Sequence, residues 1–153
     1  MQVASVPVFA GVGGGLTTGD RSANMSLFAE SEGAFAVVVN APTDVQTIQT
    51  INKMIDVPII YTVVSDKADI ASRIEAGVDI LNVSGGSQTA SIVTKIRESY
   101  PHFPIMATGG PSLESVEATI AAGANAITFT PPSNAELFKF KMEKYRLTEE
   151  RGH

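Results

Sequence analysis

The chain has 153 residues, 44% of them hydrophobic and 18% charged, with 13 glycines and 8 prolines, which excludes a disordered tail and a coiled coil. Its net charge of −5 and its lack of a Lys/Arg cluster predict no nucleic-acid partner and no binding to anionic membranes. The absence of cysteine removes disulfides, thiolate catalysis and Cys-ligated metals, and no apolar run is long enough to span a membrane. We therefore expect a cytoplasmic protein forming one domain over residues 1–153, with a terminal helix and tail over 134–153.

Six short runs rich in Val, Ile and Phe are apolar on both faces, which is typical of parallel strands covered by helices. Segments with helical periodicity separate them, so the sequence predicts repeated strand–helix units and an α/β fold. The predicted strands are residues 6–12, 35–39, 58–64, 80–83, 105–108 and 126–130. The predicted helices are residues 23–31, 45–54, 68–76, 89–99, 113–122 and 135–146.

An internal repeat pairs these units. Three segments share a glycine, a strand, a turn and a hydroxyl residue 10 positions after the glycine: Gly33 to Thr43, Gly77 to Ser87, and Gly123 to Ser133. Each glycine lies where a helix ends in a left-handed turn, and each hydroxyl lies where it could cap the next helix. The other three strands carry a proline at or near their start. The repeating unit is therefore two strand–helix pairs in about 46 residues.

Four such repeats would make a complete eight-stranded TIM barrel, and this chain has three. The sequence predicts a parallel (βα)6 TIM-barrel-like domain, an incomplete barrel of three (βα)2 units. Three arrangements remain open at this point: a closed or partly open six-stranded barrel, an oligomer whose subunits cover the open edges, and an open doubly wound sheet. The regular repeat favours the first two, and the exposed edges favour a homo-oligomer.

In either architecture ligands bind at the carboxyl ends of the strands, so the loops there hold the candidate binding residues. The first loop is glycine-rich and contains the only arginine of these loops, which together could receive an anion. Further on, polar residues end apolar strands and Gly-Gly pairs precede two helices, as phosphate-binding amides do. The predicted ligand-binding residues are Gly13, Gly14, Arg21, Asn40, Asn82, Ser84, Gly85, Gly86, Thr108, Gly109, Gly110 and Ser133.

Few residues could act in catalysis. The two histidines are His102, on the opposite face, and His153, at the terminus, so no histidine base is expected. Asp20, beside Arg21, and Asp66 are the carboxylates best placed to reach the ligand face, and they are the predicted catalytic residues. No motif has metal-ligand spacing, so neither a metal nor a cofactor is expected.

The segment PIMATGGPSLESVEATIAAGANAITFTPPS resembles the closing part of the phosphate-binding TIM barrels, such as thiamine-phosphate synthase and 2-keto-3-deoxy-6-phosphogluconate aldolase. The resemblance covers about a fifth of the chain and implies that Gly109, Gly110 and the amides near Ser133 and Asn134 hold a substrate phosphate. Class I aldolase chemistry is not expected, because no lysine falls on a predicted strand.

Two functions follow as expectations. The first is a protein that binds a small phosphorylated metabolite and acts as a lyase or isomerase. The alternative is a non-catalytic, degenerate barrel that serves as a ligand sensor or an assembly protein.

Overall fold

The computed structural model describes residues 5–129 and 133–149 and contains one sheet of six parallel strands. The strands are β1 (Phe9–Gly13), β2 (Ala36–Val39), β3 (Ile59–Val63), β4 (Ile80–Val83), β5 (Ile105–Thr108) and β6 (Ala126–Thr128). The helices are α1 (Gly19–Ser31), α2 (Val45–Asn52), α3 (Ile70–Glu75), α4 (Thr89–Ser99), α5 (Leu113–Ala121) and α6 (Asn134–Glu149), with a 3-10 turn, η1 (Gly86–Gln88), before α4. All six predicted strand–helix units are present, although the last predicted strand ends at Thr130, which lies outside the described residues.

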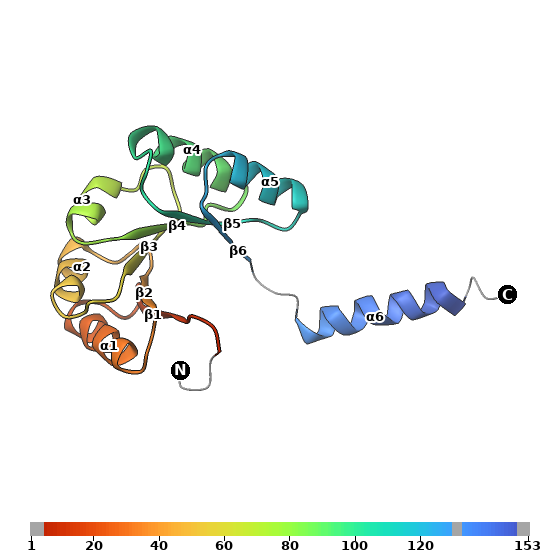
Figure 1. Ribbon diagram of the computed structural model, residues 1–153, viewed down its shortest axis with the longest axis horizontal. Helices are drawn as coiled ribbons and strands as arrows, with labels where there is room; N and C mark the ends of the chain where they lie inside the picture. The colour runs from red at the N-terminus through yellow and green to blue at the C-terminus, as the bar shows by residue number, and fades with distance from the viewer. Residues whose placement is uncertain (1–4, 130–132, 150–153) are drawn as a thin grey trace.

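The strands lie in the sheet in the same order as in the chain, from β1 to β6, and every neighbouring pair is parallel. A doubly wound sheet reverses its strand order, so this topology excludes that alternative. No pairing joins β1 to β6 among the described residues, and the sheet is open. The fold is an incomplete (βα)6 barrel: helices α1 to α5 cover the outer face of a curved sheet, while no helix of the described ranges covers its inner face (Figure 1).

The core fills the space between the sheet and the outer helices. Alternate strand residues point outward into it, among them Val39, Leu81 and Val83, and they meet apolar side chains of α2 and α4 such as Ile48 and Ile92. The alternation has a period of two, so the intervening strand residues face the inside of the barrel. The curved sheet therefore has one apolar face covered by helices and an inner face over which no helix of the described ranges lies (Figure 1).

The repeat predicted from sequence is present in atomic detail. Gly33, Gly77 and Gly123 all have positive φ, at 86°, 111° and 104°, as the helix-ending turn requires. Two residues after the second and third of these glycines, a side chain accepts the first amide of the preceding strand: Asp79 Oδ2 from Ile59 and Asn125 Oδ1 from Ile105, both at 2.9 Å. The matching residue of the first repeat is Phe35, whose ring lies 6.3 Å from that of Phe9.

The predicted hydroxyl caps are correct in only one of the three repeats. The cap of α2 is Asp44, whose carboxylate accepts the Thr47 amide at 2.8 Å, while the buried Thr43 hydroxyl has no partner among the described residues. A carboxylate accepts more strongly than a hydroxyl, which explains why Asp44 replaces its neighbour. Ser87 does not cap α4, because it lies within the 3-10 turn η1 and Gln88 precedes the helix. Ser133 does cap α6, since its hydroxyl accepts the Glu136 amide at 3.3 Å.

Two helix boundaries differ from the prediction in ways that move candidate residues. Helix α1 begins at Gly19, four residues earlier than predicted, because Thr18 is extended and the Gly19 amide donates to Thr47 Oγ1 at 2.9 Å. Asp20 and Arg21 consequently belong to the first turn of a helix rather than to a loop. Helix α3 begins at Ile70, after the capping carboxylate of Asp69, so Asp66 remains in the β3–α3 loop.

Candidate functional site at the carboxyl ends of the strands

A polar row crosses the inner face of the sheet near the carboxyl ends of its central strands. Thr62 of β3, Asn82 of β4 and Met106 of β5 are partners in register and therefore share this face. Asn82 Nδ2 donates to Thr62 Oγ1 at 3.3 Å, but the buried Asn82 Oδ1 has no hydrogen-bond partner among the described residues. An unpaired buried acceptor costs roughly 1 to 3 kcal/mol, so Asn82 holds an acceptor that a ligand hydroxyl could satisfy.

One step closer to the strand ends, Thr108 of β5 pairs in register with Thr128 of β6. Asn40 follows β2 directly, and its amide donates to the carbonyl of Gly13 at 3.1 Å. Ser84 follows β4, and its amide donates to the Val63 carbonyl at 2.8 Å. The polar strand-end residues predicted from sequence thus lie together at the carboxyl ends of the strands, as expected for a parallel sheet.

A cleft of about 500 Å³ opens beside this row, between the start of α4 and one side of α5. Backbone from both Gly-Gly loops lines it, together with hydroxyl side chains. Its lining residues near the strand ends are Gly86, Ser87, Thr89, Thr108, Gly109, Gly110, Ser112 and Ser115. Two of the three parts predicted to hold phosphate, the loops after β4 and β5, therefore meet at a single cleft.

Both Gly-Gly pairs are also needed for the turns themselves. A side chain at Gly109 would lie 2.7 Å from Ile127 and Val116, and Gly110 has a φ of 75°. In the other loop, a Cβ at Gly85 would lie 2.4 Å from Ile92. The close packing of these loops explains the glycines without a ligand.

Side chains of the protein itself accept some of the backbone amides at the two helix starts around the cleft and leave others without an acceptor. Ser112 and Ser115 form a reciprocal capping box at the start of α5. Thr89 Oγ1 accepts the Gly85 amide at 3.1 Å and donates to the Gly86 carbonyl at 2.9 Å. Among the described residues, the Gly110 amide has no backbone acceptor. The Gly110 amide and the N-termini of α4 and α5 contribute partial positive charge at the cleft, although no Lys or Arg lines it.

Gly13 and Gly14 shape the first loop around β2. A Cβ at Gly14, where φ is 100°, would lie 2.5 Å from the Asn40 Cβ, and one at Gly13 would lie 3.2 Å from Val39. The Gly14 amide donates to the Thr17 carbonyl at 3.1 Å and closes a tight turn. These glycines let the loop pack directly against the end of β2.

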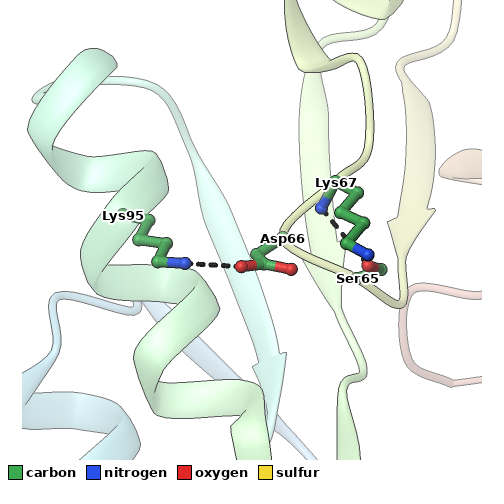
Figure 2. A network of polar contacts seen from close by, with 4 residues as sticks. All are labelled: Ser65, Asp66, Lys67 and Lys95. Carbon is green, nitrogen blue, oxygen red and sulfur yellow. Dashed lines mark hydrogen bonds and ion pairs between the residues drawn. The ribbon is translucent and has the colours of Figure 1, made fainter.

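Asp66 is joined to α4 by an ion pair. Its carboxylate lies 2.5 Å from Lys95 Nζ, and the two side chains bridge the β3–α3 loop and the helix (Figure 2). The hydrogen bond and the charge of Lys95 lower the pKa of Asp66. Lys67, next in the chain, donates its amide to Ser65 Oγ at 3.2 Å. Asp66 therefore stays ionised at neutral pH and is held toward the outer helices.

Asp20 and Arg21 lie at the β1 edge of the sheet. Arg21 lines a separate groove there with Asn24, Met25 and Phe28 of α1. The structure thus does not bring Arg21 to the cleft between α4 and α5. Ligand binding by Arg21 stays a prediction, and it would concern a place apart from the two Gly-Gly loops.

Ser133 and Asn134 follow residues outside the described ranges. The Ser133 amide and hydroxyl both donate to Glu136 Oε2, at 2.7 and 2.6 Å, and these bonds lower the pKa of Glu136. A carboxylate of the chain itself thus occupies the donors that the family resemblance assigned to phosphate. Within residues 5–129 and 133–149, no group of three His, Cys, Asp or Glu side chains could hold a metal ion.

Three residues of this face were missed by the sequence prediction. Thr62 and Thr128 lie inside runs whose overall character is apolar, although their alternation with apolar neighbours was a usable signal. For Ser112 the sequence offered one signal: it follows a proline and lies two residues after Gly110, which places it near the loop after β5.

The fold and this face together define an open parallel α/β barrel with a polar carboxyl-end surface, in the class of TIM-barrel proteins. No protein-family model matches the sequence, and no curated protein matches it. None of the helices within the described ranges is long and apolar enough to cross a membrane.

Solved structures resemble this chain in fold. An aldolase, QR15, superposes with a TM-score of 0.71 at 21% identity, over 84% of this chain and 70% of its own. A phosphonopyruvate hydrolase gives a TM-score of 0.70 at 15% identity, over 99% of this chain and 63% of its own. A mandelate oxidase variant gives a TM-score of 0.68 at 15% identity. The match covers 80% of this chain and 50% of the length of the oxidase. At such identities the likeness establishes a TIM-barrel fold shared with enzymes of different activities.

Proposed function

We propose that the carboxyl-end face binds a small phosphorylated metabolite, with the phosphate in the cleft between α4 and α5. The observation that carries this proposal is the meeting of both Gly-Gly loops and two helix starts at one cleft of about 500 Å³. Amides at helix N-termini favour an anion through their partial positive charge. Phosphate is an anion of suitable size that accepts several hydrogen bonds at once.

The remainder of the ligand would lie against the polar row. Thr108 belongs to both regions, because it lines the cleft and lies beside the strand that carries Asn82. The unpaired Asn82 Oδ1 accepts but cannot donate, so it favours a ligand hydroxyl rather than a second anionic group. A phosphorylated sugar or hydroxy acid fits this combination.

The reaction we propose is that of a lyase or isomerase, with Asp20 or Asp66 as the acid–base residue. Asp66 is ionised at neutral pH and can accept a proton only after its ion pair with Lys95 opens, which also removes the main interaction that lowers its pKa. If this assignment is correct, Asp20→Asn or Asp66→Asn abolishes turnover and leaves ligand affinity unchanged.

A non-catalytic ligand-binding role is the second candidate, and one observation favours it. The inner-face row presents hydroxyl, amide and thioether groups, and none of its three described members, Thr62, Asn82 and Met106, titrates near neutral pH. Under this role the wild-type protein binds the metabolite and shows no turnover. Absence of any binding would reject both candidates.

The test is the thermal midpoint measured with phosphate, sulfate and a panel of phosphorylated sugars and hydroxy acids. A ligand at a hundredfold excess over its Kd adds about 2.7 kcal/mol of stability and raises the midpoint visibly. Ala118→Glu places a negative charge on an exposed helix position that lines the cleft, and it should abolish the shift. Ala121→Glu, on the same helix but outside the lining, is the matched control and should retain it.

A further inference from the structure

An apolar groove of about 570 Å³ runs along the free edge of the barrel, between β1 and α1. Ala10 and Val12 of the edge strand form its floor, and Met25 and Phe28 of α1 form its wall. Phe28 is 67% exposed and Met25 is 43% exposed. In a complete barrel another helix would pack at this position, since each strand lies between two helices. The groove is therefore an incomplete packing site for a helix.

Helix α6 has an exposed apolar surface that packs against no other described element. Phe138, Met142 and Tyr145 recur at spacings of four and three residues, so they form one stripe along the helix. They are 67%, 39% and 69% exposed, and α6 extends away from the sheet at the β6 end of the molecule (Figure 1). A helix of this kind gains most of its stability in water from packing its apolar face. The stripe is thus a packing surface without a partner among the described residues of its own chain.

We propose that two copies of the chain pair by exchanging α6, the stripe of each helix packing into the β1–α1 groove of the other copy. The lengths match: at about 1.5 Å per residue the stripe from Phe138 to Tyr145 spans about 10 Å, and the part of α1 that lines the groove, from Arg21 to Ala29, spans about 12 Å. Each chain supplies one helix and one groove, so two reciprocal contacts close the pair and leave neither surface exposed. This pairing does not depend on the proposed ligand site.

A second copy fits better than the same chain because of where the two surfaces lie. The groove belongs to β1 and the helix follows β6, which are the two opposite edges of the sheet. In the structure α6 points away from its own sheet and does not cover its own groove (Figure 1). Exchange between copies covers both surfaces without requiring the sheet to close.

The first experiment measures the mass of the full chain in solution by light scattering across a concentration series. The wild type should have the mass of two 16.1 kDa chains. Phe28→Glu in the groove and Met142→Glu in the stripe should each give the mass of one chain. Phe140→Glu is the control: Phe140 is 69% exposed but lies about 200° around α6 from Phe138, so the pair should persist. Far-UV circular dichroism checks that each variant keeps its fold.

Mixing the two disruptive variants tests the reciprocal arrangement. The Phe28→Glu chain keeps its helix stripe and the Met142→Glu chain keeps its groove, so the mixture should recover a two-chain species held by one contact. A wild type of one-chain mass, or a two-chain mass that survives Phe28→Glu, would overturn the proposal.

Because the chain contains no cysteine, introduced cysteines can test the pairing by disulfide cross-linking. A Phe28→Cys chain mixed with a Met142→Cys chain should form a disulfide-linked pair in oxidised glutathione, whereas Phe28→Cys mixed with Phe140→Cys should not. In the double variant Phe28→Cys/Met142→Cys, the proposal predicts links between chains. A link formed only within one chain would show that α6 docks on its own groove, and would contradict the exchange.

Discussion

The central strand β3 and the edge strand β6 each combine apolar residues with one threonine, but their surroundings are very different. All five residues of β3 are buried, whereas none of the three residues of β6 is. Strand β3 has a strand on each side and helices over its outer face, while β6 has one neighbour. Burial in this fold is therefore conferred by the adjoining units of the repeat rather than by the composition of a strand.

The largest effect should come from truncating the centre. Ile59→Ala removes a side chain that is 1% exposed and should cost about 2 to 5 kcal/mol in urea unfolding. The same change in β6, Ile127→Ala, should cost about 1 kcal/mol, because that side chain is only partly buried. Equal losses would show that β6 is covered in solution and would remove the distinction between centre and edge.

A polar group within the buried centre should behave in the opposite way. Asn82→Leu removes the buried Oδ1 acceptor that has no described partner and loses only the long hydrogen bond to Thr62 Oγ1, at 3.3 Å, so the unfolding free energy should stay the same or rise by about 1 kcal/mol. The same variant should lose affinity for the metabolite that raises the wild-type midpoint. A destabilised variant would mean that Asn82 serves the fold rather than a ligand.

The cap of α2 provides a smaller and sharper test within one turn. Asp44→Ala removes the acceptor of the Thr47 amide and should cost about 1 kcal/mol. Thr43→Val, one residue earlier, removes a buried hydroxyl that has no partner in the described part of the chain, and it should be neutral or stabilising. The comparison is made by chemical denaturation of both variants, and a larger loss in Thr43→Val would restore the cap predicted from sequence.

The ion pair between Asp66 and Lys95 should have the smallest effect, because the Lys95 side chain is 58% exposed. Lys95→Gln should lower the urea midpoint slightly at neutral pH and low salt, and not at high salt. The folded-state pKa of Asp66 is lowered, so the stabilising contribution of the ion pair is fully present above the unfolded value of about 4 and is lost progressively as the pH falls from there through the lower folded-state pKa. A loss that persists in high salt would contradict this surface role.

Most of the fold could be predicted from sequence because its determinants are local. Apolar runs and the helical patterns between them located all six units, and Gly33, Gly77 and Gly123 fixed the repeat through their left-handed turns. The helix starts could be predicted less well. They depend on contacts between distant residues, as when Thr47 binds the Gly19 amide and extends α1 by a turn.

The candidate site could be predicted only in part. The parallel topology was enough to predict that Asn82, Thr108 and the Gly-Gly loops lie at the carboxyl ends of the strands. The partners of side chains could not be predicted from residue spacing. Asp66 pairs with Lys95, which is 29 residues away in the chain, and Arg21 lines the β1–α1 groove because it lies on helix α1. Whether Asp20 and Asp66 act in catalysis stays a prediction.

The most direct test of the ligand site is a ¹H–¹⁵N NMR titration of the protein with inorganic phosphate, repeated with the panel compound that raises the midpoint most. We predict saturable shifts centred on the amides of Gly86, Ser87 and Gly110, which line the cleft between α4 and α5. These shifts should be absent in Ala118→Glu and present in Ala121→Glu. Shifts confined to the β1 loop around Gly14, or no saturable shift at all, would contradict a phosphate site at this cleft.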